Sequence, residues 1–347
     1  MAYKGFPKAM WIAGAVLLAI IVAEAIFVFS TGLEKTATVA DEDDAVVAVS
    51  PLHVEGTKLV DSQGQPVAMH GISIGWHNLW PRFYNSDAAL TLVNDWNCKL
   101  IRAAIGADDL GEMLNGTTYH PGYITDPQGA LEKLFAVVDG AIAGGAYVIV
   151  DWHSHRLHLA EATEFFTAVA NRYKGKPNVI YELFNEPIND SWADLKAYAE
   201  SLIATITSID DSHPLILMGC PRWDQAIELP AADPITSYDN VMYTMHFYAG
   251  THKEWLREVS DAAMAAGLPI FISECAAMTA SGDGPLDMES WKEWADWADA
   301  RGINIVLWSL SDKDESCSML TPAATSEGPW PDEVVKPWGK IARDFLK

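Results

Sequence analysis

Short apolar runs alternate with amphipathic segments from residue 67 to the end of the chain, and this alternation limits the possible folds more than any other feature. The apolar runs predict eight strands, at residues 67–74, 100–105, 147–151, 179–184, 214–218, 241–245, 269–272 and 303–308. Helical periodicity predicts helices between them, at 131–143, 160–173, 192–209, 253–266 and 290–300. Strands that alternate with helices form a parallel sheet, and eight repeats predict a single (β/α)8 barrel.

The first fifty residues lie outside this repeating pattern. Residues 9–29 are apolar except for Glu24, and Lys4 and Lys8 precede them. A helix of this length would span the roughly 30 Å core of a bilayer, and the positive flank predicts a cytoplasmic N-terminus with an exported C-terminal domain. We therefore expect residues 1–30 to form an uncleaved signal anchor, 31–50 an acidic linker and 51–347 the barrel. A cleaved signal peptide, which would give a secreted protein, is the alternative.

Charge and cysteine content exclude several classes of partner. The formal net charge is -24, and such an acidic surface repels phosphate backbones, so we do not expect nucleic acid binding. The four cysteines contain no C-x-x-C pair, so a structural zinc site is not expected. We expect a monomeric catalytic domain without a metal or cofactor. Fourteen tryptophans provide flat apolar faces, some for the core and some for stacking on sugar rings.

Polar and aromatic residues follow the predicted strands. In a (β/α)8 barrel the C-terminal ends of the strands meet at one rim, which is where chemistry takes place. The side chains expected at this rim are Arg102, His153, Asn185, Glu186, Trp223, His246, Tyr248, Glu274, Trp308 and Lys313. Their accumulation after strands predicts an active-site cleft at the C-terminal rim.

Two of these residues are carboxylates that can face each other across the cleft. Glu186 and Glu274 both follow apolar strands at the same end of the barrel. A pair of carboxylates suits cleavage of a glycosidic bond, with one protonated as the acid and the other ionised. Their separation decides between retention and inversion, and different environments decide which one is the acid. Arg102 could form a structural ion pair with one carboxylate, which would also keep that carboxylate ionised.

Seven motifs in this order resemble glycoside hydrolase family 5, the retaining cellulase family, and most of all its subfamily 2 endoglucanases. They are GISIGWHNLWPRFYN, LIRAAIG, VIVDWHSH, VIYELFNEP, VMYTMHFYAGTHK, FISECA and VLWSLSDKDE. The resemblance covers residues 52–345. It implies a TIM barrel that hydrolyses internal β-1,4-glucosidic bonds by double displacement.

The resemblance also implies a role for each residue of the catalytic centre. Glu186 would be the general acid/base and Glu274 the nucleophile. Around them the resemblance implies a supporting shell, formed by Arg102, His153, Asn185, His246 and Tyr248. Along the cleft it implies residues that bind the glucan, namely Trp308, Lys313, Glu315, Trp223, Trp80 and His77.

Three positions depart from the pattern of the family. Cys275 follows the nucleophile where relatives usually carry an aromatic residue. Gly106 stands where many relatives have a tyrosine, and Gly75 where many have a histidine, for which His77 would compensate. These departures concern substrate preference rather than the reaction.

Other functions remain open at this point. A metal-dependent hydrolase could use His153, His155, His246 and Asp312 as ligands, because H-x-H pairs bind metal in other barrel enzymes. A hydrolase fold that only binds glycan is a second alternative. Within catalysis, the substrate could be mannan or mixed-linkage glucan, since single hydroxyl differences in a pocket contribute only a few kcal/mol to selectivity.

Overall fold

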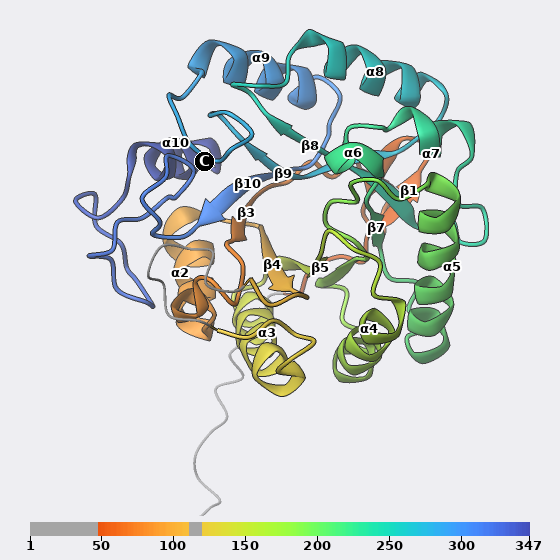
Figure 1. The fold of residues 1–347 in the computed structure, drawn as a ribbon, viewed down its shortest axis with the longest axis horizontal. Coiled ribbons are helices and arrows are strands. Elements are labelled where there is room, and N and C mark those ends of the chain that lie inside the picture. The colour runs from red at the N-terminus through yellow and green to blue at the C-terminus, as the bar shows by residue number, and fades with distance from the viewer. Residues whose placement is uncertain (1–47, 111–119) are drawn as a thin grey trace, which may run out of the picture. The chain divides into compact units, whose positions relative to one another are not determined.

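Eight parallel strands close into a barrel in the computed structural model, which describes residues 48–110 and 120–347. The strands are β3 (His70–Ile74), β4 (Leu100–Gly106), β5 (Tyr147–His153), β6 (Val179–Glu182), β7 (Ile216–Met218), β8 (Val241–Tyr248), β9 (Ile270–Ala276) and β10 (Ile305–Leu310). They follow chain order around the barrel, and β10 pairs with β3 to close it. Each matches one predicted strand, so the (β/α)8 prediction is confirmed (Figure 1).

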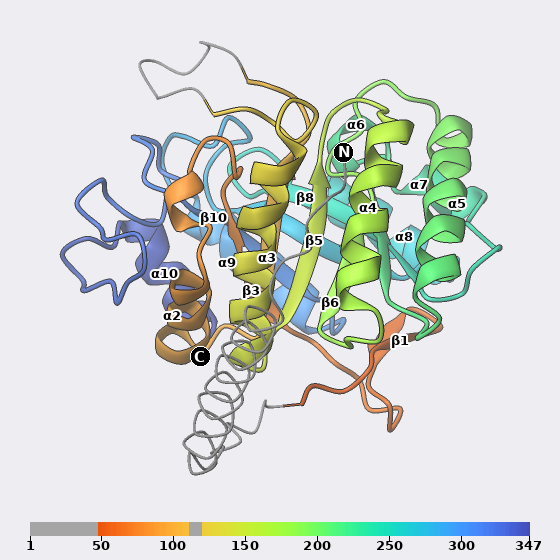
Figure 2. The same cartoon turned by 90° about the horizontal axis from the view of Figure 1, so that it is seen from below.

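Helices pack around the outside of the strands (Figure 2). Those predicted are α3 (Pro127–Ala143), α4 (Leu159–Tyr173), α5 (Trp192–Ile209), α8 (Glu254–Ala265) and α9 (Met288–Asp299). The structure adds α2 (Ser86–Trp96), α10 (Pro337–Phe345), the short α6 (Pro221–Asp224) and α7 (Glu228–Ala232), and the 3-10 helix η1 (Pro81–Phe83). Four of the helices begin at side chains that accept a free backbone N–H, the N-caps Asn85, Asp126, Ser191 and Asp287.

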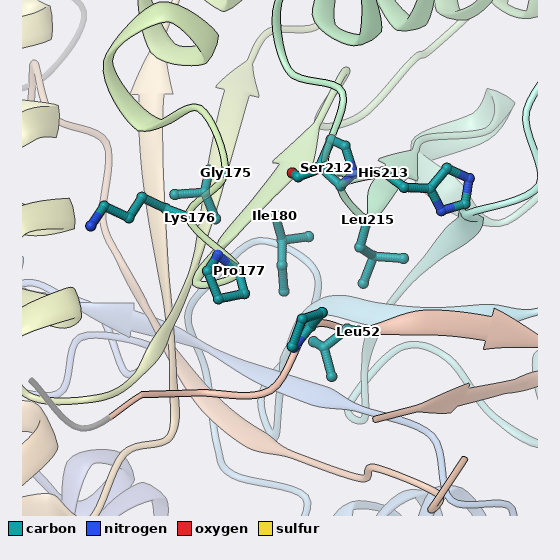
Figure 3. Close-up of a pocket in the computed structure, with 11 residues that line it drawn as sticks. Leu52, Gly175, Lys176, Pro177, Ile180, Ser212, His213 and Leu215 are labelled. Atoms are coloured by element: carbon teal, nitrogen blue, oxygen red, sulfur yellow. The ribbon is translucent and has the colours of Figure 1, made fainter. Parts of the chain in front are cut away.

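The core has two parts. The larger lies between helices and strands and includes the tryptophans of α9. The smaller fills the N-terminal end of the barrel, where Leu52 and Leu59 pack on side chains from the strands. These two residues belong to a segment that forms the antiparallel pair β1 (His53–Glu55) and β2 (Lys58–Val60). A hollow of about 80 Å³ at this end is lined by loop residues and by Val179 and Ile180 of β6, and its lining contains no group of catalytic side chains (Figure 3).

The expected signal anchor and most of the expected linker lie outside the described residues. Among the helices that the structure does describe, none is long and apolar enough to cross a membrane. The four cysteines, Cys98, Cys220, Cys275 and Cys317, are buried and free.

Candidate active site

A buried arginine organises the C-terminal rim of the barrel. Arg102 projects from β4 and is fully buried. Its guanidinium donates to Glu182 (2.7 Å), to the amide oxygen of Asn185 (2.6 Å) and to Glu274 (3.0 Å), and lies 2.9 Å from Asp151. A rigid guanidinium with several donors can hold several acceptors in fixed positions. Arg102 therefore sets the positions of side chains from β5, from β6 and the loop after it, and from β9 across the barrel.

Glu274 lies near the end of β9 and is 5% exposed. One carboxylate oxygen accepts from the Arg102 guanidinium and the other from the Tyr248 hydroxyl at 2.7 Å. Both contacts stabilise a negative charge on the carboxylate. The sequence-based expectation that Arg102 and Tyr248 flank Glu274 is therefore matched by the geometry.

Glu186 lies in the loop that follows β6. The backbone N–H groups of Asn185 and Glu186 donate to carbonyl oxygens at the end of β5, which fixes this loop against the neighbouring strand. Oε1 of Glu186 lies 2.9 Å from Nδ1 of His246. Burial raises the pKa of Glu186, and burial lowers the pKa of His246 to about 4. Glu186 and Glu274 thus lie in different environments: burial favours the protonated form of Glu186, whereas a guanidinium and a hydroxyl hold the two oxygens of Glu274.

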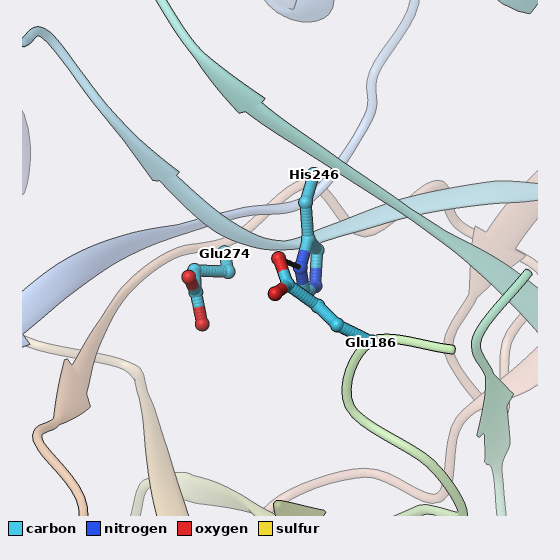
Figure 4. A group of neighbouring side chains, drawn as sticks. All are labelled: Glu186, His246 and Glu274. Carbon is cyan, nitrogen blue, oxygen red and sulfur yellow. Dashed lines mark hydrogen bonds and ion pairs between the residues drawn. The ribbon is translucent and has the colours of Figure 1, made fainter. Parts of the chain in front are cut away.

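The two carboxylates lie close together. One oxygen from Glu186, one from Glu274 and a ring nitrogen of His246 all lie within 4.8 Å of one another (Figure 4). The side chains come from the β6 loop, β9 and β8 and converge on one point.

Two cavities meet at this carboxylate pair. The first, of about 420 Å³, is lined by Trp76, Trp80, Trp308, Lys313 and Glu315 among others. The second, of about 510 Å³, is lined by Trp223, Gln225, Thr251 and His252. Glu186, Tyr248 and Glu274 line both cavities. Together the cavities form a cleft with the carboxylates in the middle and aromatic rings on either side, an arrangement suited to a chain of sugar rings.

His153 lies at the floor of the first cavity. Its ring stacks on Trp308 with centroids 5.5 Å apart and planes 9° apart. Its Nδ1 lies 2.6 Å from a carboxylate oxygen of Asp151, which Arg102 also contacts. His153 is thus tied to the same charged network as Glu274.

His77 does not lie in the cleft. Its side chain is 2% exposed, and its Nδ1 accepts the backbone N–H of Gly106 at 3.0 Å. Burial lowers its pKa to about 3. The expectation that His77 contacts the substrate is therefore wrong, because its ring supports the backbone below the cleft.

Other side chains fill the space beside Gly75 and Gly106, two of the three positions that depart from the pattern of the family. A Cβ atom on Gly75 would lie 2.6 Å from the ring of Trp80, and one on Gly106 would lie 2.5 Å from Asn78 Oδ1 and 3.1 Å from the ring of Trp76. These glycines allow two tryptophans to pack close to the backbone of the cleft wall. Cys275, the third departure, is buried and donates to a backbone carbonyl of β10.

Several residues of the site were not identified from the sequence. They are Trp76 in the cleft wall and the buried polar residues Asp151, Glu182, Asp224 and Ser273. Glu182 stands within the apolar run VIYELF, and an ionisable residue in such a run is a signal that could have revealed it.

The metal-site alternative is not supported by the positions of its proposed ligands. Asp312 forms an ion pair with Arg82 at 2.7 Å. His153 contacts Asp151 through Nδ1. Glu186, His246 and Glu274 could in principle surround an ion, but both oxygens of Glu274 already accept hydrogen bonds from protein groups.

Comparisons with known proteins identify the family. Residues 60–314 match the model of the cellulase family, glycosyl hydrolase family 5. The chain belongs to this family. It is 36% identical over 304 residues to endoglucanase Z of Dickeya dadantii, and the aligned region covers 85% of this chain and 68% of that protein. It is also 36% identical to endoglucanase A of Evansella cellulosilytica, covering 82% of this chain and 57% of that protein.

Solved structures of this glycoside hydrolase family agree with the fold. The catalytic domain of endoglucanase Cel5A from Thermobifida fusca superposes with a TM-score of 0.77 at 31% identity, covering 85% of this chain and 97% of that one. A variant of the same domain was solved with cellotetraose. The chain thus spans nearly all of a catalytic domain and about six-tenths to two-thirds of the longer curated relatives.

Proposed function

We propose that the protein is a retaining endo-β-1,4-glucanase. The observation that carries this proposal is the close approach of Glu186 and Glu274, whose facing oxygens lie within 4.8 Å. Carboxylates about 5–5.5 Å apart belong to retaining enzymes, whereas inverting enzymes need roughly 6.5–9.5 Å to admit a water. The named relatives of this glycoside hydrolase are endoglucanases, which supports a β-1,4-glucan as the substrate.

The surroundings of the two carboxylates support a different role for each. Glu274, held by a guanidinium and a hydroxyl, attacks the anomeric carbon and forms a glycosyl ester. Glu186, whose pKa burial raises, donates its proton to the departing oxygen. In the second half of the reaction Glu186 takes a proton from water, and the hydroxyl breaks the ester with retention.

The remaining residues position the sugar. The amide oxygen of Asn185 is held by Arg102, which leaves its N–H₂ without a protein partner among the described residues and free for the 2-hydroxyl. Trp308, with His153 stacked on it, forms the floor under the reacting sugar. Trp80, Lys313 and Glu315 bind the non-reducing side, and Trp223 the leaving-group side.

The experiment measures reducing ends released by the chain from carboxymethylcellulose and from β-mannan. We expect cleavage of the glucan and a rapid fall in its viscosity. Glu186→Gln and Glu274→Gln each remove most activity, and a variant that keeps more than about a tenth of wild-type turnover refutes the role of that residue. Cleavage of mannan alone would keep the mechanism and replace the substrate. Binding of cello-oligosaccharide without turnover would support the glycan-binding alternative.

We also propose that residues 9–29 anchor a monomeric enzyme in a membrane, with the barrel on the outer side. The support is the apolar length of this segment and the positive charge of Lys4 and Lys8 before it. Membrane fractionation with N-terminal sequencing tests the anchor, and gel filtration in detergent tests the monomer. A mature N-terminus after residue 25 or 40 would replace the anchor with a cleaved signal peptide.

A further inference from the structure

We propose that Trp255 is a further sugar-binding residue, which extends the leaving-group side of the cleft by stacking on a glucose unit of the bound glucan. The inference rests on the proposed function, because it concerns how the same cleft holds a long β-glucan chain. The unit on Trp255 lies beyond those held in the cavity that Trp223 lines. The enzyme therefore prefers a chain that extends well past the cleaved bond on this side.

Trp255 is one of only two exposed tryptophans among the described residues. The other is Trp223, and each of the two is 46% exposed. The helix that carries Trp255, α8, packs on the barrel through Leu256, Ser260 and Ala263, so the Trp255 ring is not part of the core. A single exposed apolar side chain is common on protein surfaces. The position of the ring therefore has to decide whether it binds a ligand.

Both exposed tryptophans lie just after neighbouring strands of the barrel. β7 and β8 pair with each other, Trp223 follows β7, and Trp255 lies in the first turn of α8, which follows β8. The cavity on the leaving-group side is lined by Trp223 and Gln225 after β7 and by Thr251 and His252 after β8. Trp255 thus lies at the rim of the barrel, three residues beyond the wall of this cavity.

His252 connects Trp255 to the cavity. Its side chain lines the cavity, and its ring lies edge-on to the Trp255 ring with the centroids 6.1 Å apart. Trp255 itself does not line the cavity, whereas both carboxylates do. A sugar on the Trp255 ring is therefore next to the cavity and farther from the cleaved bond than the sugars inside it.

His252 also offers a hydrogen-bond donor on this side of the cleft. Its Nδ1 accepts the backbone N–H of Tyr248 at 2.8 Å. Burial lowers the pKa of His252 to about 4, so near neutral pH the ring carries one hydrogen, on Nε2. Nε2 has no protein partner among the described residues, and it is not among the side-chain atoms sealed from solvent. It can donate to a hydroxyl of the glucan beside Trp255.

The segment that leads to Trp255 is held in place without a ligand. The backbone N–H of Ala249 donates to the end of β9 at 2.8 Å. The carbonyl of His252 accepts from the Trp294 ring nitrogen at 3.0 Å. The Lys253 ammonium forms an ion pair with Asp287 at 2.6 Å. A binding surface on a fixed segment loses little conformational entropy when a ligand binds.

Trp255→Ala tests the proposal on two substrates that differ on the leaving-group side. Cellohexaose can place several glucose units there, whereas 2-chloro-4-nitrophenyl β-cellobioside places none. We expect kcat/KM on cellohexaose to fall about 2- to 10-fold, the effect of one aromatic stacking contact. On the aryl cellobioside it should change by less than about 1.5-fold, because a contact made only by the longer substrate is lost.

The bond that is cleaved gives a second readout, which a purely structural role would not change. In cellohexaose labelled with ¹⁸O at the reducing end, Trp255→Ala should move cleavage toward that end, because binding with many units on the leaving-group side is weakened. Trp255→Phe keeps a flat ring and should restore most of the wild-type pattern. Leu159→Ala is the matched control, since Leu159 is 42% exposed in the first turn of α4 and lines neither cavity. It should leave both readouts unchanged.

The outcomes distinguish this inference from the function on which it rests. Equal losses on cellohexaose and on the aryl cellobioside would overturn the role of Trp255, as would unchanged cleavage of cellohexaose at unchanged bonds. Weaker binding to insoluble cellulose with normal cleavage of cellohexaose would indicate a separate surface site, which would also overturn it. A wild-type chain inactive on both substrates would instead overturn the proposed function.

Discussion

The Tyr248 hydroxyl offers a direct measure of how the site stabilises its nucleophile. It donates to Glu274 at 2.7 Å inside a buried site. A hydrogen bond to a charged group contributes about 1.5–3 kcal/mol. If this energy is retained in the transition state and lost in Tyr248→Phe, kcat/KM on carboxymethylcellulose falls about 10- to 150-fold, at 1.36 kcal/mol for each factor of ten.

Tyr181→Phe is the matched control. Its hydroxyl is also buried, but it has no hydrogen-bond partner among the described residues and lies outside the cleft. Its removal should leave activity unchanged and stability equal or higher, because an unsatisfied buried hydroxyl is costly. Tyr248→Phe with more than half of wild-type kcat/KM, in a protein that melts normally, would refute the argument.

Three further predictions follow from other contacts. Trp223→Ala removes a 46% exposed ring at the leaving-group side. The kcat/KM on carboxymethylcellulose should therefore fall about 2- to 10-fold, while the free energy of unfolding changes by less than about 0.5 kcal/mol. A large shift of the melting temperature would contradict this prediction. The pKa of His77 falls from 6.5 to about 3 on folding, so the unfolded chain binds more protons than the folded chain between these values. On acidification from pH 6.5 to 4.5 the wild type should therefore lose about 2.3 kcal/mol more unfolding free energy than His77→Asn, and equal losses in denaturant titrations would argue against a buried neutral ring. Activity should persist in excess EDTA, since Glu274 has protein partners on both oxygens; loss that zinc or magnesium restores would support the metal-hydrolase alternative.

The barrel could be predicted because its strands are short apolar runs with helices between them. Among the helices missed, α2 carries a signal that could have revealed it, because Ala88, Leu92 and Trp96 recur at helical spacing, whereas α10 carries less. In α10, for example, the buried face consists of only Trp338, Gly339 and Ala342. The connection between β7 and β8 holds two helices of four and five residues, too short to show helical periodicity.

The site could be predicted where function depends on a strand end, and not where it depends on side-chain direction. Glu186 follows β6 and Glu274 lies near the end of β9, so topology brings both to one rim. His77 lies near the same rim, but its ring turns to the backbone of Gly106, a choice that residue order does not reveal. Asp224 reaches His246 only because the chain turns through positive φ angles at non-glycine residues.

Trapping the covalent intermediate tests the central claim most directly. A 2-deoxy-2-fluoro-β-cellobioside with a dinitrophenolate leaving group slows the second step, so the glycosyl-enzyme should accumulate. Mass spectrometry of the digested protein should then find one fluorocellobiosyl group, on the peptide that contains Glu274. Turnover without any adduct, or an adduct on Glu186, would contradict the assignment of nucleophile and acid.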